Sequence, residues 1–344
     1  MNNFKKIGVS ALAGSLAMVS ANAVEYSMSG GLMAVYTTQD SNLSTESGRG
    51  IGTATDLAFK ASGELDNGFT VDYVMNIDTD AALSNTSAQM IVGMGSMGVF
   101  RINNEFGSMV NAIDDVMPTA YNETWDGLTG ASSDPSFFGS STSKGSFDYR
   151  LPTQSYAGTD INIGITYDPA AGAGAATKGG ISNTAAGTAG SGQGYAITMK
   201  HESGLEIGGG LEVLDDDQGQ LLSSGTERQT GYIKFSSAGF TLAAQEAYQN
   251  SMNSTATEGA DKEATFWGVS YAAGDISVSY GESTLQTMAS SNAAVGAEIQ
   301  LESVQAAYTM GAMTISAAIS ETANVGGTAN AKYEESTLAV SFAF

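Results

Sequence analysis

The feature that most constrains this chain is an alternation of apolar and polar residues that recurs from Val24 to Phe344. In residues 69–78, FTVDYVMNID, every odd position is apolar, and residues 161–167, INIGITY, follow the same pattern. Successive side chains of a β-strand point to opposite faces, so this period of two predicts strands with one apolar and one polar face. The last residues, STLAVSFAF at 336–344, alternate in the same way and end on Phe344.

Single glycines mark the short connections between these strands. Seven stretches place one glycine between two alternating segments: DNGFT (66–70), SMGVF (96–100), YAGTD (156–160), ESGLE (202–206), SAGFT (237–241), AAGDI (272–276) and MGAMT (310–314). Glycine adopts a positive φ at tight hairpin turns without steric cost. The connections between these hairpins are long and polar, and the longest covers residues 104–144.

Counting the strands on either side of each turn gives about sixteen, an even number that puts both ends of the chain on the short-turn side. The expected strands are 25–37, 53–65, 68–79, 86–95, 97–103, 145–152, 159–168, 193–202, 204–214, 227–237, 239–249, 262–273, 275–283, 296–309, 311–322 and 332–344. All 4 prolines lie in or beside connections, as expected for a residue that cannot donate to a strand ladder.

Two architectures accommodate so many strands: a soluble β-sandwich or repeat protein, and a closed transmembrane barrel whose apolar face meets lipid. The barrel is favoured because many strands reach the 9–11 residues of a tilted membrane span. Aromatic residues also gather at both strand ends, as two membrane girdles would. Those expected near the short turns are Phe69, Phe100, Phe235, Phe240, Tyr271, Tyr308, Phe342 and Phe344, and those near the long loops are Tyr36, Tyr167, Tyr248 and Tyr280. We predict an all-β transmembrane antiparallel barrel.

The N-terminus predicts export. Residues 1–23 carry Lys5 and Lys6, then an apolar stretch, then Ala21-Asn22-Ala23, which is the pattern of a secretory signal peptide. Residues 24–344 would then form one barrel domain. Removing two of 13 basic residues leaves 11 against 36 acidic ones, so the mature net charge is 11 − 36 = −25. The chain has no Cys, so disulfides do not hold the fold together.

The charged residues suggest how a water-filled interior would be lined. By strand parity, five cations share the polar face: Lys60, Arg101, Arg150, Lys200 and Lys234. The connection 104–144 carries six acids before its first cation, Lys144: Glu105, Asp114, Asp115, Glu123, Asp126 and Asp134. A connection of this length without regular structure is uncommon unless it is functional or disordered. It is either a solvated acidic surface loop or, given its apolar residues, a segment that packs onto another part of the protein.

Other chemistries are weakly supported. One His and no Cys remove thiol catalysis and most metal clusters, so no catalytic residues, metal site or cofactor are predicted. Acidic runs such as DDD at 215–217 could hold Ca²⁺, but they lack EF-hand spacing, which favours a solvated run. Net acidity argues against nucleic acid as a partner.

Three segments resemble a known family: VEYSMSGGLMAVY (24–36), GSMGVFRINNEFGSMVNAIDDV (95–116) and the last strand. With the signal peptide and the alternation, they look like a Gram-negative outer-membrane porin, most like the alphaproteobacterial general porins. The resemblance covers nearly the whole chain in layout, although each motif is loose. It implies a sixteen-stranded homotrimer in the outer membrane, among lipid and lipopolysaccharide, whose third loop folds into the lumen and narrows it.

From that resemblance we expect the acids of 104–144 to face the wall cations across a constriction. The pore would pass small hydrophilic solutes and ions with mild cation preference, since the acidic mouth concentrates cations. The resemblance also implies that Phe342 and Phe344 are recognised by the outer-membrane assembly machinery. A substrate-specific channel and a surface structural or adhesive β-protein remain alternatives.

Overall fold

The computed structural model describes residues 25–43, 47–78, 84–104, 110, 113–114, 116–124, 145–171, 190–215, 225–251, 261–289 and 294–344. The expected signal segment, 1–23, lies outside these ranges. The strands are β1 (Glu25–Ser41), β2 (Gly48–Glu64), β3 (Thr70–Asp78), β4 (Ser84–Gly93), β5 (Val99–Asn104), β6 (Ser146–Arg150), β7 (Gln154–Tyr156), β8 (Thr159–Ala171), β9 (Gly190–His201), β10 (Leu205–Asp215), β11 (Gly225–Ser237), β12 (Phe240–Ser251), β13 (Asp261–Ala273), β14 (Ile276–Met288), β15 (Ala294–Met310), β16 (Met313–Ala323) and β17 (Lys332–Ala343).

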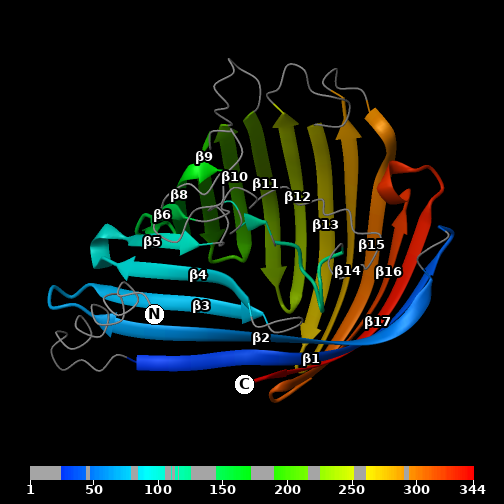
Figure 1. Ribbon diagram of the computed structural model, residues 1–344, viewed down its shortest axis with the longest axis horizontal. Helices are drawn as coiled ribbons and strands as arrows, with labels where there is room; N and C mark the ends of the chain where they lie inside the picture. Colours follow the sequence, from blue (N-terminus) through cyan, green and yellow to red (C-terminus); the bar gives the residue numbers. More distant parts are fainter. Residues whose placement is uncertain are drawn as a thin grey trace, which may run out of the picture.

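These strands form one closed antiparallel sheet (Figure 1). Consecutive strands pair with one another, and β6 and β7 both pair with β8 because a break around Pro152 divides one wall strand in two. Counted this way the barrel has sixteen strands, which confirms the predicted architecture. In the described ranges, no helix is both long and apolar enough to span a bilayer.

The barrel closes between its first and last strands. The register of β1 and β17 runs from Gly31 opposite Ala343 to Ser41 opposite Tyr333. Below this register, the backbones of Gly30 and Phe344 exchange two hydrogen bonds, with N···O distances of 2.9 and 3.0 Å. Lipid offers no hydrogen bonds to a free strand edge, so this seam satisfies the last unpaired backbone groups of the wall.

The outer face is apolar around the middle of the barrel. Large apolar side chains point outward from successive strands, and they include Leu32, Phe59, Tyr73, Ile163, Ile197, Ile233, Leu242, Val278, Val304, Ile319 and Leu338. Aromatic residues lie on this face near the short turns, where the Phe240 and Tyr271 rings have centroids 4.4 Å apart. This is the alternation that the sequence predicted.

On β13 to β17 the polarity of the two faces reverses toward the long-loop end. Above Tyr280, Val304 and Ile319 the outward residues become acidic, and the row continues from strand to strand through Glu282, Glu302, Glu321, Glu334 and Asp40. Near this level the buried inward residues are mixed: Ala264, Phe266, Leu285, Ile299, Leu301 and Tyr333 are apolar, and Ser283, Ser303, Ser320, Thr322 and Glu335 are polar. The wall therefore changes here from a lipid-facing barrel to one with a partly apolar interior and a polar exterior.

This reversal explains why several strands are longer than predicted. The sequence pattern ended one strand at residue 283, but β14 continues to Met288, and β12 continues past residue 249 to Ser251. The expected connection at 39–52 is likewise shorter, because β1 ends at Ser41 and β2 begins at Gly48. Beyond the apolar band the outward residues are polar. Alternation with apolar residues on the outer face therefore no longer identifies these parts of the strands in the sequence.

All seven turn glycines adopt positive φ, and two of them form a matched pair for testing the turns. Gly204 has φ +92°, and a Cβ added there would lie 2.0 Å from the backbone oxygen of Ser236. Gly274 has φ +59°, and a Cβ there would meet nothing within 4 Å.

We expect Gly204→Ala to destabilise the barrel more than Gly274→Ala. Both substitutions place alanine in the left-handed region, at a cost of about 1–2 kcal/mol, and only Gly204→Ala adds a backbone clash. Urea titration of protein folded into lipid vesicles, followed by tryptophan fluorescence, would measure the unfolding midpoints. Equal midpoints for the two variants would contradict this account.

Candidate functional site

Part of the 104–144 connection lies against the inner wall. Val110, Ile113 and Val116 are each at most 6% exposed. They belong to one apolar cluster with inward side chains of β9, β11 to β15 and β17: Ala196, Tyr232, Ala247, Ala264, Phe266, Leu285, Ile299, Leu301 and Tyr333. The apolar residues at the reversed end of the wall are therefore the surface on which these loop residues pack.

Glycines at inward positions make room for this segment. A Cβ on Gly210 of β10 would lie 2.8 Å from Val110 Cγ1 and 2.9 Å from Ile113 Cδ1. A Cβ on Gly268 of β13 would lie 3.3 Å from the Pro118 ring. A Cβ on Gly281 of β14 would lie 3.0 Å from Thr124 Cγ2. The three glycines mark where the described residues Val110, Ile113, Pro118 and Thr124 meet the wall, a signal that the sequence did not reveal.

Hydrogen bonds from uncharged wall side chains hold the same segment. Gln245 Nε2 of β12 donates to the Ile113 carbonyl at 2.8 Å, and Ser279 Oγ of β14 accepts from the Ala120 N–H at 2.8 Å.

On β15, Gln305 makes two of these bonds. Its Oε1 accepts from the Tyr121 N–H at 2.8 Å, and its Nε2 donates to the Asn122 carbonyl. Thr124 shares a further short hydrogen bond with Ser283 of β14. We call these contacts of Gln245, Ser279, Ser283 and Gln305 the wall latch.

The acids predicted on this connection are only partly placed. Asp114 and Glu123 are described, and both are partly buried beside the wall. The other four, Glu105, Asp115, Asp126 and Asp134, lie outside the described residues.

Each predicted wall cation lies near a carboxylate of the wall. Lys60 Nζ lies 3.7 Å from Asp72 Oδ1. Arg101 is paired across the sheet with Asp148, which also acts electrostatically on the adjacent Arg150.

The remaining two predicted cations flank one acid. Lys200 of β9 and Lys234 of β11 are the register partners of Glu206 on β10. Glu206 also accepts a hydrogen bond from the Tyr232 hydroxyl at 2.7 Å. Together with the pairs on β2 to β6, this arrangement brings each predicted cation near opposite charge within the wall itself. We call these five cations and their carboxylate neighbours the basic belt.

The basic belt lies toward the short turns. Glu206 is four residues before Gly210, about 13 Å along a strand, and Gly210 is where the loop segment contacts β10. Arg150 is the last residue of β6, and Lys200 is next to the last residue of β9. Among the described residues, the ion pair that involves a belt cation is Lys60–Asp72, and none joins the belt to the loop acids.

A further inward ion pair was missed by the sequence analysis. Arg228 Nη1 of β11 lies 2.9 Å from Glu212 Oε2 of β10, and Arg228 Nε donates to Gln249 Oε1 at 2.9 Å. The Glu212 side chain is fully buried. Arg228 and Lys234 lie on the same strand and are an even number of residues apart, so the alternation could have predicted that Arg228 also points inward.

The other predicted positions lie apart from this region. Phe342 and Phe344 point outward and are 45% and 63% exposed, and their expected role in assembly stays a prediction. His201, the sole histidine, lies at a turn with its Nδ1 2.8 Å from Ser203 Oγ. Of the acidic run 215–217, the structure describes the backbone of Asp215 and no more. Within the described residues, no group of three or more His, Asp or Glu side chains could hold a metal ion.

Solved structures with the same fold are bacterial porins. An anion-selective porin from Comamonas acidovorans has a TM-score of 0.67 and 10% sequence identity, covering 94% of this chain and 100% of that one. The trimer form of OmpT, an outer membrane protein of Vibrio cholerae, has a TM-score of 0.62 and 9% identity, with 94% and 100% covered. A mutant of the Rh. blastica porin has a TM-score of 0.61 and 14% identity, with 93% and 100% covered.

At these identities the structural likeness establishes the fold alone. A search of curated protein sequences gave no match. The family model for Gram-negative porins matches residues 8–344, which is nearly the whole chain. With the closed barrel and its polar inner face, this match shows that the chain belongs to the Gram-negative porin family.

Proposed function

We propose that this protein is an outer-membrane pore for the passive diffusion of small hydrophilic solutes and ions. The observation that carries the proposal is the two-faced wall: apolar outside, polar inside, and closed by hydrogen bonds all the way round. Such a wall is stable in hydrocarbon and encloses a path that water can fill. The finer assignment to the alphaproteobacterial general porins rests on the sequence resemblance.

The connection 104–144 would narrow this path. Support comes from its described residues, which pack on the inner wall and are held by the wall latch. A segment held in this way reduces the open cross-section, so the latch would fix the size limit of the pore. The six acids of the connection would line this narrow part on one side.

Charge would give the pore a mild preference for cations. Asp72, Asp148 and Glu206 offset three of the five positive charges of the basic belt, whereas the mature chain as a whole would carry 11 − 36 = −25. The excess acids raise the local concentration of cations at the mouth, most strongly at low salt. The anion-selective porin from Comamonas acidovorans shows that this fold also occurs with the opposite preference.

The proposed partners follow from a position in the outer membrane. We propose a homotrimer, as in the trimer form of the Vibrio cholerae protein, surrounded by bilayer lipid and lipopolysaccharide. Export through the signal segment 1–23 and insertion by the assembly machinery complete the proposal.

Liposome swelling tests the pore itself. We expect liposomes containing the folded protein to swell in isotonic sugars, with a rate that falls smoothly as the sugar becomes larger. Fast entry of one sugar alone would indicate a substrate-specific channel. No swelling beyond protein-free liposomes would favour a structural or adhesive role.

Reversal potentials in a KCl gradient test the selectivity. We expect the wild-type protein to favour K⁺, and Glu206→Gln to weaken that preference because Lys200 and Lys234 lose their shared carboxylate. Glutamine keeps an oxygen acceptor for the Tyr232 hydroxyl, so the wall should remain intact. Glu302→Gln on the outer face is the matched control and should leave the reversal potential unchanged. An anion-selective wild-type protein would refute the proposal.

Single-channel recordings test the wall latch. Gln305→Ala removes two hydrogen bonds to residues 121–122, and each lost bond, about 1 kcal/mol, raises the detached population about fivefold. We expect more frequent excursions to higher conductance and faster entry of the larger sugars. Gln300→Ala changes an exposed outward glutamine of the same strand and serves as the control. Recordings of Gln305→Ala that match the wild type would show that the latch does not set the aperture.

A further inference from the structure

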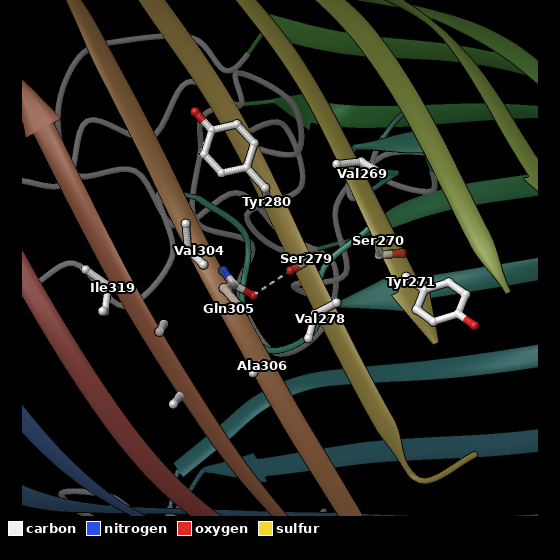
Figure 2. A pocket seen from close by; sticks show the side chains of 12 residues that line it. Val269, Ser270, Tyr271, Val278, Ser279, Tyr280, Val304, Gln305, Ala306 and Ile319 are labelled. Atoms are coloured by element: carbon white, nitrogen blue, oxygen red, sulfur yellow. Dashed lines mark hydrogen bonds between the residues drawn. The ribbon is translucent and has the colours of Figure 1, made fainter. Parts of the chain in front are cut away.

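The outer wall carries a groove between β13 and β16. Its cavity has a volume of about 480 Å³, and its lining is almost entirely apolar (Figure 2). Ala306 and Ala317, which face each other across β15 and β16, form its floor. Larger side chains border this floor: Val269, Tyr271, Val278, Tyr280, Val304 and Ile319.

The groove ends where the wall changes polarity. Tyr280, Val304 and Ile319 form its border on the long-loop side, and the next outward residue on each of these strands is Glu282, Glu302 or Glu321. A hydrocarbon chain lying in the groove is therefore in the apolar band, and a polar group attached to its end lies beside these three carboxylates.

Two of these carboxylates make no ion pair in the described part of the chain, although Glu302 also acts electrostatically on Lys332. Glu321 Oε1 lies 3.1 Å from Lys332 Nζ. Glu282 and Glu302 are direct register partners on β14 and β15, and in the described part of the chain no ion pair includes either. Like charges directly opposite each other destabilise a sheet, so a cation placed between them would be stabilising.

Aromatic rings complete this end of the groove. The Trp267 and Tyr280 ring centroids are 5.4 Å apart. Trp267 Nε1 donates to Glu282 at 3.0 Å, and the Tyr280 hydroxyl lies within hydrogen-bond distance of both Glu282 and Glu302, to one of which it donates its proton. Carboxylates held beside aromatic rings favour an ammonium group, through charge-assisted hydrogen bonds and cation–π attraction.

We propose that this groove binds one membrane lipid with a protonated amine in its headgroup. An acyl chain fills the groove over Ala306 and Ala317, and the amine lies beside the Glu282 and Glu302 carboxylates, next to the Tyr280 hydroxyl that contacts both. The position of the groove and the charge of the acidic row both favour this occupant. A lipid whose acyl chain lies in the groove has its headgroup at the level of the acidic row, where a positive charge is stabilised. The inference requires a bilayer around the barrel and is independent of what the pore conducts.

Native mass spectrometry of the folded protein tests the inference. The protein would be exchanged into mild detergent with EDTA and equal phosphatidylethanolamine and phosphatidylglycerol of identical chains. We expect the wild type to retain phosphatidylethanolamine over phosphatidylglycerol by about tenfold, as one charge-assisted hydrogen bond would give. Ala306→Trp fills the floor and should abolish the retention. Ala34→Trp, at an exposed outward position of β1, is the control and should keep it.

The double variant Glu282→Gln/Glu302→Gln distinguishes binding of the acyl chain from recognition of the headgroup. It should retain lipid but bind the two headgroups about equally, because the charge-assisted hydrogen bond is lost. Unchanged retention in Ala306→Trp, or a wild-type preference for phosphatidylglycerol, would overturn the proposal. Loss of the oligomer in Ala306→Trp but not in Ala34→Trp would also overturn it, since a second copy would then cover the groove. Swelling rates of all variants should match the wild type, so this outcome is read separately from pore function.

Discussion

The structure depends on one constraint: a backbone N–H or C=O group in hydrocarbon has no water to bond with. Every strand must therefore pair on both sides, and the pairing of β1 with β17 closes the ring. Closure fixes which way each side chain points, because the alternation along every strand becomes an inside and an outside. The lipid-facing apolar residues, the polar lumen and the inward loop contacts all follow from it.

A second level of organisation lies above the apolar band. There apolar side chains in the interior of β13, β14, β15 and β17 form a cluster with Val110, Ile113 and Val116, while the exterior becomes acidic. This end of the molecule resembles a soluble protein, with a small hydrophobic core and a charged surface. The core holds the loop segment, and the charged surface limits how far the barrel sits in the bilayer. One change of polarity along the strands therefore provides both the surface that holds the loop segment and the charged exterior beyond the bilayer.

The sequence was sufficient for the architecture because alternation and turn glycines are local signals. Gly204 and its six counterparts fix the hairpins, and the outward residues of each strand identify the lipid face. The ends of β12 and β14 were missed because their outward residues become polar. The loop path was also missed, since it depends on Gly210, Gly268 and Gly281, which lie far apart in the chain and meet residues 110–124 only after closure. Likewise, parity placed Lys200 and Lys234 on the inner face, but their shared neighbour Glu206 depends on register.

The wall latch has a consequence for how this pore could diverge. Its bonds join amide, hydroxyl and backbone groups on β12, β14 and β15, whereas the charges of the basic belt lie on other strands, from β2 to β11. Under the proposed function, aperture and charge would therefore be set by two separate groups of residues. A lineage could reverse the sign of its preferred ion through the belt alone and keep the same size limit.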